Sequence, residues 1–217
     1  MEGIRKASGA APTWQDNRAL ADMLAQAADA AMDVLDPRSL LKQTDITGVE
    51  EGVLTGREVT IPSRELCRLV ATMHQANSIY GFALTLGGEL DALIEKNQRT
   101  SLARALLLDA AGSFLAELYA AQVEDHLRKT ISRQGRELSA RFSPGYGDWE
   151  IACGQPALFR FLRPETIGIT LRPSGMMSPM KSITGICISA AHVPHRTPCS
   201  LCHKKDCRYR RADIKRL

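Results

Sequence analysis

The chain has 217 residues, of which 44% are hydrophobic and 24% are charged. This length and apolar content suffice for one sizeable core and do not match the composition of disordered chains. The net charge is only +4 and aromatic residues make up 5% of the chain, so the basic, aromatic-rich surface typical of nucleic-acid binding is missing. The sequence shows neither a run of about twenty apolar residues nor a signal-peptide pattern, and we expect a cytoplasmic protein that binds neither nucleic acid nor membrane.

The first third of the chain begins with helical spacing. Apolar residues from Trp14 to Leu41 predict an amphipathic helix that is stopped at Asp36-Pro37. β-branched residues on both sides of a glycine predict a short hairpin over 53–61. Ser63 is then placed to cap a following helix.

The middle of the chain alternates between strand and helix patterns. Residues 78–85 are apolar and β-prone, and 89–94 return to a helical period. The longest helical pattern runs from 101 to about 134, interrupted only by Gly112. We therefore expect a strand, a short helix and then a long central helix.

Beyond Gly135, short segments are separated by glycine and proline. They predict a helix over 157–162 and strands over 167–171 and 182–189. Together the elements predict an α+β fold, with a mainly antiparallel sheet packed against helices that include one long central helix.

Three regions are expected along the chain. Residues 1–48 form an N-terminal helical segment, 49–190 form the main domain, and 191–217 form a cysteine-rich basic tail. Much of the excess positive charge lies in the last fifteen residues, so it is a local feature of the tail.

The segment Arg141–Trp149 holds more special residues than an ordinary turn. Gly145 permits a positive φ and lets a ligand approach the main chain closely. Arg141 offers a rigid donor fork that suits a carboxylate, and Tyr146 offers an aromatic face with a polar tip. A zwitterionic ligand with a flat ring would suit this loop, although a structural ion pair of Arg141 and a core position for Tyr146 fit the composition equally well.

The segment reads Arg-Phe-Ser-Pro-Gly-Tyr and resembles a loop in the activation domain of vitamin B12-dependent methionine synthase, where Arg-x-x-Pro-Gly-Tyr holds S-adenosylmethionine. A second block, 167–185, resembles that family's later stretch of Gly, Leu-Thr, Ser, Met, Pro and Ser-x-x-Gly at matching intervals. Two ordered blocks are more specific than either alone. The resemblance covers about residues 78–190 and is closest to short stand-alone forms of the domain. It departs at Arg172-Pro173, where the larger enzymes have Thr-Glu.

The resemblance implies a role for several residues. Arg141 would hold the carboxylate of S-adenosylmethionine, and Ser143 and Gly145 would offer main-chain contacts. Tyr146 would lie beside the nucleoside or methionine portion. Glu117, on the long helix, would meet the ammonium group, although a solvated or helix-paired Glu117 is an equal alternative.

The resemblance also implies an accessory role in reactivating a cobalamin-dependent methionine synthase or a related corrinoid methyltransferase. There, cob(II)alamin receives an electron, for example from a flavodoxin or ferredoxin, while S-adenosylmethionine supplies a methyl group. We expect the cobalamin to be on a partner protein, because the lower-ligand pattern Asp-x-His-x-x-Gly is absent here. The glycine-rich dinucleotide and P-loop fingerprints are absent as well, which argues against a Rossmann methyltransferase.

Three cysteines, Cys199, Cys202 and Cys207, crowd together in the tail. Close thiolates suit a [4Fe–4S] cluster or zinc, and free or structural thiols are the alternative. A fourth ligand is missing from the run and would come from Cys187, His195 or His203. This cluster supports an alternative function, a metal- or redox-sensing interaction protein.

Overall fold

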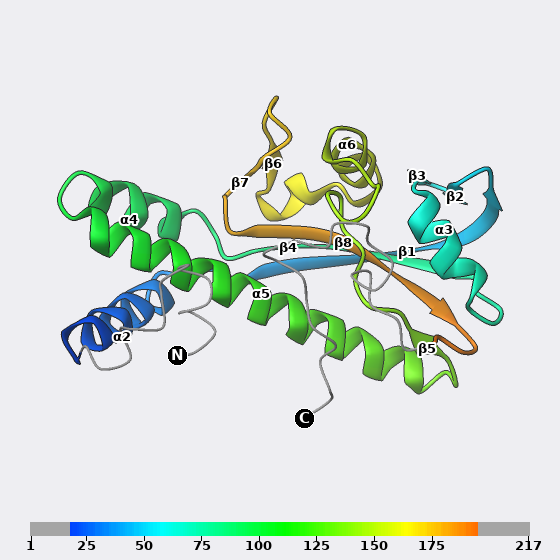
Figure 1. Ribbon diagram of the computed structural model, residues 1–217, viewed down its shortest axis with the longest axis horizontal. Coiled ribbons are helices and arrows are strands. Elements are labelled where there is room, and N and C mark those ends of the chain that lie inside the picture. The colour runs from blue at the N-terminus through cyan, green and yellow to red at the C-terminus, as the bar shows by residue number, and fades with distance from the viewer. Residues whose placement is uncertain (1–17, 195–217) are drawn as a thin grey trace.

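The structure is a computed structural model that describes residues 18–194, and it shows a long twisted sheet with helices on both faces (Figure 1). All strand pairs in the six-stranded sheet of the described chain are antiparallel, in the order β3-β2-β1-β4-β8-β5. The strands are β1 (Arg38–Glu50), β2 (Val53–Gly56), β3 (Thr60–Pro62), β4 (Ser78–Thr85), β5 (Glu137–Leu138) and β8 (Ser182–Ala190). A separate pair consists of β6 (Thr170–Leu171) and β7 (Met177–Ser178).

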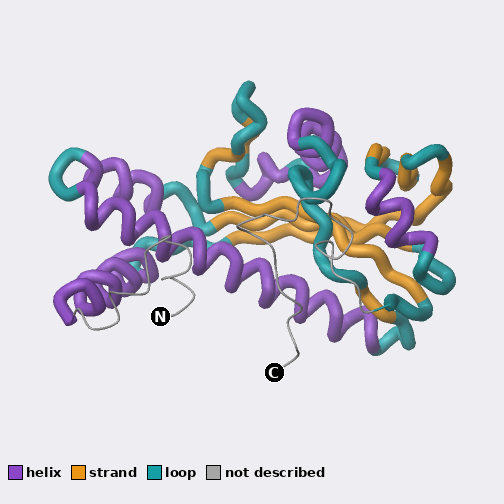
Figure 2. The backbone as a smooth tube through the Cα atoms, in the orientation of Figure 1, coloured by secondary structure: helices purple, strands orange, loops and turns teal. Residues whose placement is uncertain are grey.

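The helices lie in two layers around this sheet. They are α2 (Arg18–Met32), α3 (Arg64–Ala71), α4 (Glu89–Gln98), α5 (Leu102–Ser132) and α6 (Ile151–Leu162), with a 3-10 turn η2 (Pro164–Ile167). The long helix α5 crosses one face, and α6 with the β6–β7 pair stands on the other, as Figure 2 shows. The expected α+β fold with a mainly antiparallel sheet and one long helix is confirmed.

The central strands β4 and β8 explain how the layers form. They pair over their full length, from Ser78 opposite Ser189 to Thr85 opposite Ser182. Successive side chains in a strand point to opposite faces. Phe82 therefore packs with α5, while its neighbour Ala83 belongs to the cluster that contains α6 and α3.

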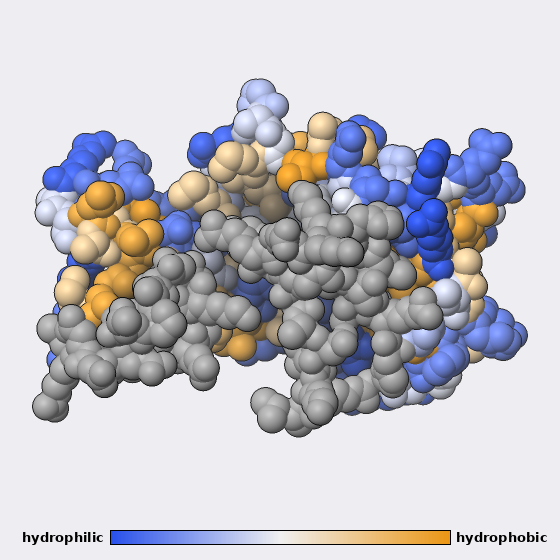
Figure 3. Space-filling model, in the orientation of Figure 1, coloured by the Kyte–Doolittle hydropathy of each residue, from blue (hydrophilic) through white to orange (hydrophobic). Residues whose placement is uncertain are grey.

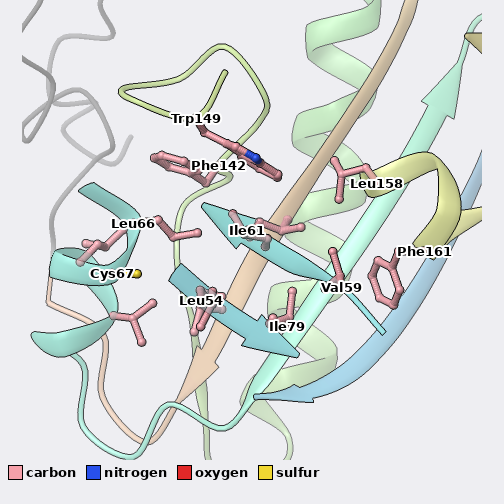
Figure 4. Packing of buried hydrophobic residues seen from close by; sticks show 14 of the residues in the cluster. Leu54, Val59, Ile61, Leu66, Cys67, Ile79, Phe142, Trp149, Leu158 and Phe161 are labelled. Carbon is pink, nitrogen blue, oxygen red and sulfur yellow. The ribbon is translucent and has the colours of Figure 1, made fainter. Parts of the chain in front are cut away.

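The hairpin and the helix cap predicted between 53 and 63 are confirmed. β2 and β3 pair with Leu54 opposite Ile61, and both side chains are fully buried. Ser63 has an extended backbone, and its side chain accepts a hydrogen bond from the amide of Leu66. Ser63 thereby caps the N-terminus of α3. Figure 4 shows Leu54, Ile61 and Leu66 in the apolar cluster that joins the hairpin, α3 and α6.

Strand β1 is the largest difference from the sequence prediction. The helix expected to stop at Asp36-Pro37 ends at Met32, and residues 38–50, for which no strand was predicted, pair with β4 on one edge and with β2 on the other. β1 lies mostly at the surface and has a single buried residue, Thr44, so its polar, weakly patterned sequence gave no strand signal. It also runs across residue 48, the expected boundary of the N-terminal segment.

The strand expected over 167–171 is reduced to Thr170–Leu171. Ile167 ends the 3-10 turn η2, and Gly168 follows with a φ of 82°, in the left-handed region that breaks a strand. Ile169 is fully buried. Here the apolar residues predicted correctly that the segment is inside, but not its backbone conformation.

Helix α5 continues through Gly112 without interruption. A Cβ atom at that position would lie 2.7 Å from Cδ2 of Leu90 and 3.0 Å from Cε of Lys181, so glycine allows α4 and the residue before β8 to approach the helix closely. Within residues 18–194, α5 meets the length and composition criteria of a membrane-spanning helix. Core helices of soluble proteins meet them too, so the expected absence of membrane binding stays a prediction.

Exposed apolar side chains collect at the end of the molecule formed by α4 and the start of α5 (Figure 3). Leu102 is 75% and Leu106 is 56% exposed.

Candidate functional site

The segment Arg141–Trp149 connects β5 to α6 and lies against β8. The amide of Phe142 donates to the carbonyl of Ile186 at 2.8 Å, and the reverse bond is also 2.8 Å. This bridge places the side chains of Arg141 and Ser143 beside Gly185. A Cβ atom at Gly185 would lie 2.8 Å from Oγ of Ser143 and 2.9 Å from Cγ of Arg141, so the close approach requires a glycine there.

The loop is held in shape by its own aromatic residues. The rings of Phe142 and Trp149 stack with centroids 5.8 Å apart, and Tyr146 meets Phe142 edge-on at 6.2 Å. Figure 4 shows Phe142 and Trp149 lying together above the apolar cluster. The amide of Gly145 donates to the carbonyl of Trp149 at 2.7 Å, with a φ of 94° at Gly145. The loop is therefore preorganised, with Gly145 exposed at its tip.

Arg141 is the buried centre of the site, with 3% of its surface exposed. Its Nη2 donates to Oε2 of Glu117 at 2.8 Å and to the hydroxyl of Tyr146 at 3.3 Å. Its Nε lies 3.6 Å from Oε1 of Glu124. Burial acts to lower the pKa of Arg141, but Tyr146, Glu117 and Glu124 outweigh it and the pKa lies above its ordinary value. The guanidinium is thus a permanent buried cation.

Part of this cation's hydrogen-bonding capacity is unused. Nε and Nη1 of Arg141 and Oγ of Ser143 are buried and have no hydrogen-bond partner among the described residues. Leaving buried polar groups without a partner costs stability. A ligand that brings a carboxylate would supply the acceptors that this arrangement lacks.

Polar residues line one face of α5 along the site, at helical spacings of four and seven: Asp109, Ser113, Glu117, Glu124 and Arg128. At one end, Nζ of the buried Lys181 contacts Oδ1 of Asp109 at 2.6 Å and Oγ of Ser113 at 3.0 Å. At the other end, Nη1 of Arg128 donates to the carbonyl of Leu138 at 2.5 Å. Arg141 lies between these two contacts.

The structure brings Glu117, on α5, together with Arg141, Ser143 and Tyr146 of the loop, as the resemblance implied. Glu124 was missed, and its signal is the spacing of seven from Glu117, which places both carboxylates on one helix face. Their ligand-binding roles stay predictions.

The expected metal site falls largely outside the described residues, because Cys199, Cys202 and Cys207 lie in 195–217. Cys187, a candidate fourth ligand, is fully buried on β8. Burial raises the pKa of the Cys187 thiol well above its ordinary value, with a further increase from Glu124. No group of three or more potential metal ligands occurs within 18–194.

Exposed apolar residues flank the loop. Ile151, at the start of α6, is 49% exposed, and it would contact a Cβ atom at either Gly145 or Gly175. Met176, which follows Gly175, is 54% exposed, whereas Met180 is 42% exposed and lies by α4, where its amide donates to Asp91. Of the three methionines in this region, Met177 packs against the core.

Comparison with known proteins supports the fold described above. No family model matches the chain, and no curated protein matches it. Among solved structures, the chain is similar to a crystal structure of the MetH reactivation domain bound to AdoHcy, with 16% sequence identity and a TM-score of 0.57. The match covers 86% of this chain and 70% of that chain. At this identity, the similarity establishes the fold alone.

Proposed function

We propose that this chain binds S-adenosylmethionine at Arg141 and is an accessory component that reactivates a cobalamin-dependent methyltransferase. The observation that carries the proposal is the buried guanidinium of Arg141, whose Nε and Nη1 have no hydrogen-bond partner among the described residues. A ligand carboxylate would accept from these donors. Glu117, half exposed beside them, would meet the ammonium group of the same amino-acid moiety.

The remainder of the ligand would lie along the loop. Tyr146 is partly buried, follows the exposed Gly145 and packs edge-on against Phe142, and an aromatic face suits a flat nucleoside base. The MetH reactivation domain of the similar crystal structure is bound to AdoHcy, which differs from S-adenosylmethionine by the transferred methyl group. The similarity of fold and the resemblance of the loop support the same ligand class here.

The contribution of this chain to methyl transfer is positioning. The methyl group leaves the sulfonium, its bonding electrons stay on sulfur, and the acceptor is the reduced cobalt of a cobalamin on the partner protein. If the chain holds the sulfonium at a fixed place next to the methyl acceptor, the transfer no longer depends on a chance encounter of two molecules in solution. The electron that reduces the cobalt would come from a flavodoxin or ferredoxin, or through a cluster at Cys199, Cys202 and Cys207.

The exposed side chains of Ile151, at the start of α6, and of Met176, next to Gly175, support a partner surface beside the loop. Methionine is flexible and polarisable and suits contacts that form and separate. A partner that carries cobalamin would meet the ligand at this side of the molecule.

Calorimetric titration of anaerobically purified protein with S-adenosylmethionine tests the proposal. Replacing Arg141 with alanine should weaken binding about tenfold or more, as expected for a lost charge-assisted contact. Arg57→Ala is the matched control, because Arg57 pairs with Asp45 on the exposed surface, and it should bind like the native chain. Absence of binding by the native protein would contradict the proposal, and bound zinc in that protein would favour the metal-sensing alternative.

A further inference from the structure

Asp148 connects the loop to helix α3 through its carboxylate. Oδ1 accepts a hydrogen bond from Oγ of Ser63 at 2.5 Å, and Oδ2 accepts from the amide of Arg64 at 2.8 Å. The amide of Glu65 lies 3.3 Å from both oxygens. One side chain of the loop therefore contacts three consecutive residues at the start of α3.

These contacts complete the cap of the helix. The first amides of a helix have no partner within it, and Ser63 satisfies only that of Leu66, at 3.0 Å. The amides of Arg64 and Glu65 donate to the carboxylate of Asp148, which lies more than eighty residues away along the chain. A carboxylate at this position is also favoured by the partial positive charge of the helix N-terminus.

Gly147 brings the main chain of the loop against the same turn of α3. Its φ is 57°, and a Cβ atom there would lie only 2.0 Å from Oε2 of Glu65. A side chain at this position would displace the Glu65 carboxylate, and the positive φ disfavours any residue other than glycine. Residues 147 and 148 thus form a continuous contact with α3.

Tyr146 connects the residues that contact α3 to the candidate ligand site. It directly precedes Gly147, its carbonyl accepts from the amide of Trp149 at 3.0 Å, and its hydroxyl accepts from Nη2 of Arg141 at 3.3 Å. We infer that Asp148 is a positioning residue for ligand binding, which fixes the loop on α3 so that Tyr146 and Arg141 face the ligand. This inference rests on the proposed function.

Affinity for S-adenosylmethionine, measured by calorimetry below the unfolding temperature of every variant, tests it. Asp148→Ala should weaken binding about tenfold, the cost of a lost charge-assisted anchor. Asp148→Asn should retain part of the affinity, because the amide oxygen still accepts hydrogen bonds, and it keeps the test valid if the alanine variant does not fold. Asp45→Ala, which removes an exposed carboxylate paired with Arg57, should leave the affinity unchanged.

A double-mutant cycle with Tyr146→Phe separates positioning from simple stabilisation. If Asp148 acts through Tyr146, the combined loss of affinity should be smaller than the product of the two single losses. Native-like affinity in both Asp148 variants, with binding that still depends on Arg141, would overturn the inference and leave the proposed function intact. Independent losses in the cycle would also overturn it, and no binding by the native chain would overturn both.

Discussion

Nη2 of Arg141 donates a hydrogen bond of 2.8 Å to Oε2 of Glu117, which lies 24 residues earlier on α5. The two side chains differ in environment, since 1% of the Arg141 side chain and 50% of the Glu117 side chain are exposed. The carboxylate therefore reaches from the surface to a buried cation, and its exposed half remains accessible to a ligand.

Replacing Glu117 with glutamine should weaken S-adenosylmethionine binding by about three- to tenfold. The amide can still accept the hydrogen bond from Arg141, but the negative charge that would attract the ligand ammonium is lost. Calorimetry at low and high salt checks this, with the smaller difference expected at high salt. Glu95→Gln, on the exposed surface of α4 beside Arg99, is the control, and equal affinities of the two variants would contradict the assigned role.

Gly185→Ala should impair both folding and binding. The new methyl group would lie within 3.0 Å of Ser143 and Arg141 side-chain atoms, and overpacking of this kind costs about 1–3 kcal/mol. Gly48→Ala is the control, because a Cβ atom at that strand position meets no atom within 4 Å. Urea unfolding and ligand titration measure the two effects, and a native-like Gly185→Ala variant would show that the loop tolerates displacement.

Removing Asp109 should destabilise the protein more than removing Lys181, its partner in an ion pair. The Lys181 side chain is 9% exposed and that of Asp109 is 48% exposed. Asp109→Ala leaves a buried cation with Ser113 alone and should cost about 2–4 kcal/mol of unfolding free energy. Lys181→Met leaves a carboxylate that water can reach and should cost less. Urea unfolding compares them, and a larger loss for Lys181→Met would refute this reasoning.

Cys187 should make the protein less stable at alkaline pH. Burial raises the pKa of this thiol above its ordinary value of 9.0, so above pH 9 the unfolded chain loses a proton that the folded chain keeps. The contribution of Cys187 to the free energy of unfolding is fully present below pH 9 and decreases as the pH rises above 9. In Cys187→Ala, stability between pH 8 and about 10 should fall less steeply. The exposed Cys153 is the control, and Cys153→Ala should keep the native pH dependence.

Much of the fold follows from local patterns in the sequence. The apolar run of β4, the cap at Ser63 and the period of α5 each appear in the structure where their residues predict them. These elements have a strong local signal, because one side is buried or one residue type is required. β1 has no such signal: its partners β4 and β2 determine its conformation, and those contacts are distant in sequence.

The candidate site was only partly predictable for the same reason. The residue types of Arg141 and Tyr146 indicated a ligand loop, but nothing in the sequence singled out Asp148. Its contact with Ser63 depends on how the hairpin and α3 pack against the loop. The pairing of Glu124 with Arg141 likewise depends on the position of α5 over the sheet.

The polar face of α5 also contributes to the register of this helix, beside the close approach at Gly112. Its buried surface includes five alanines, Ala105, Ala110, Ala111, Ala116 and Ala120, and such small, similar side chains add little to the resistance against sliding. A shift by one residue turns a helix by about 100° and moves it by about 1.5 Å, which would break the contacts of Asp109, Glu117 and Arg128 together. A ligand that bridges Arg141 and Glu117 would therefore lock the helix at its midpoint, so its binding energy would oppose any displacement of α5 along the sheet.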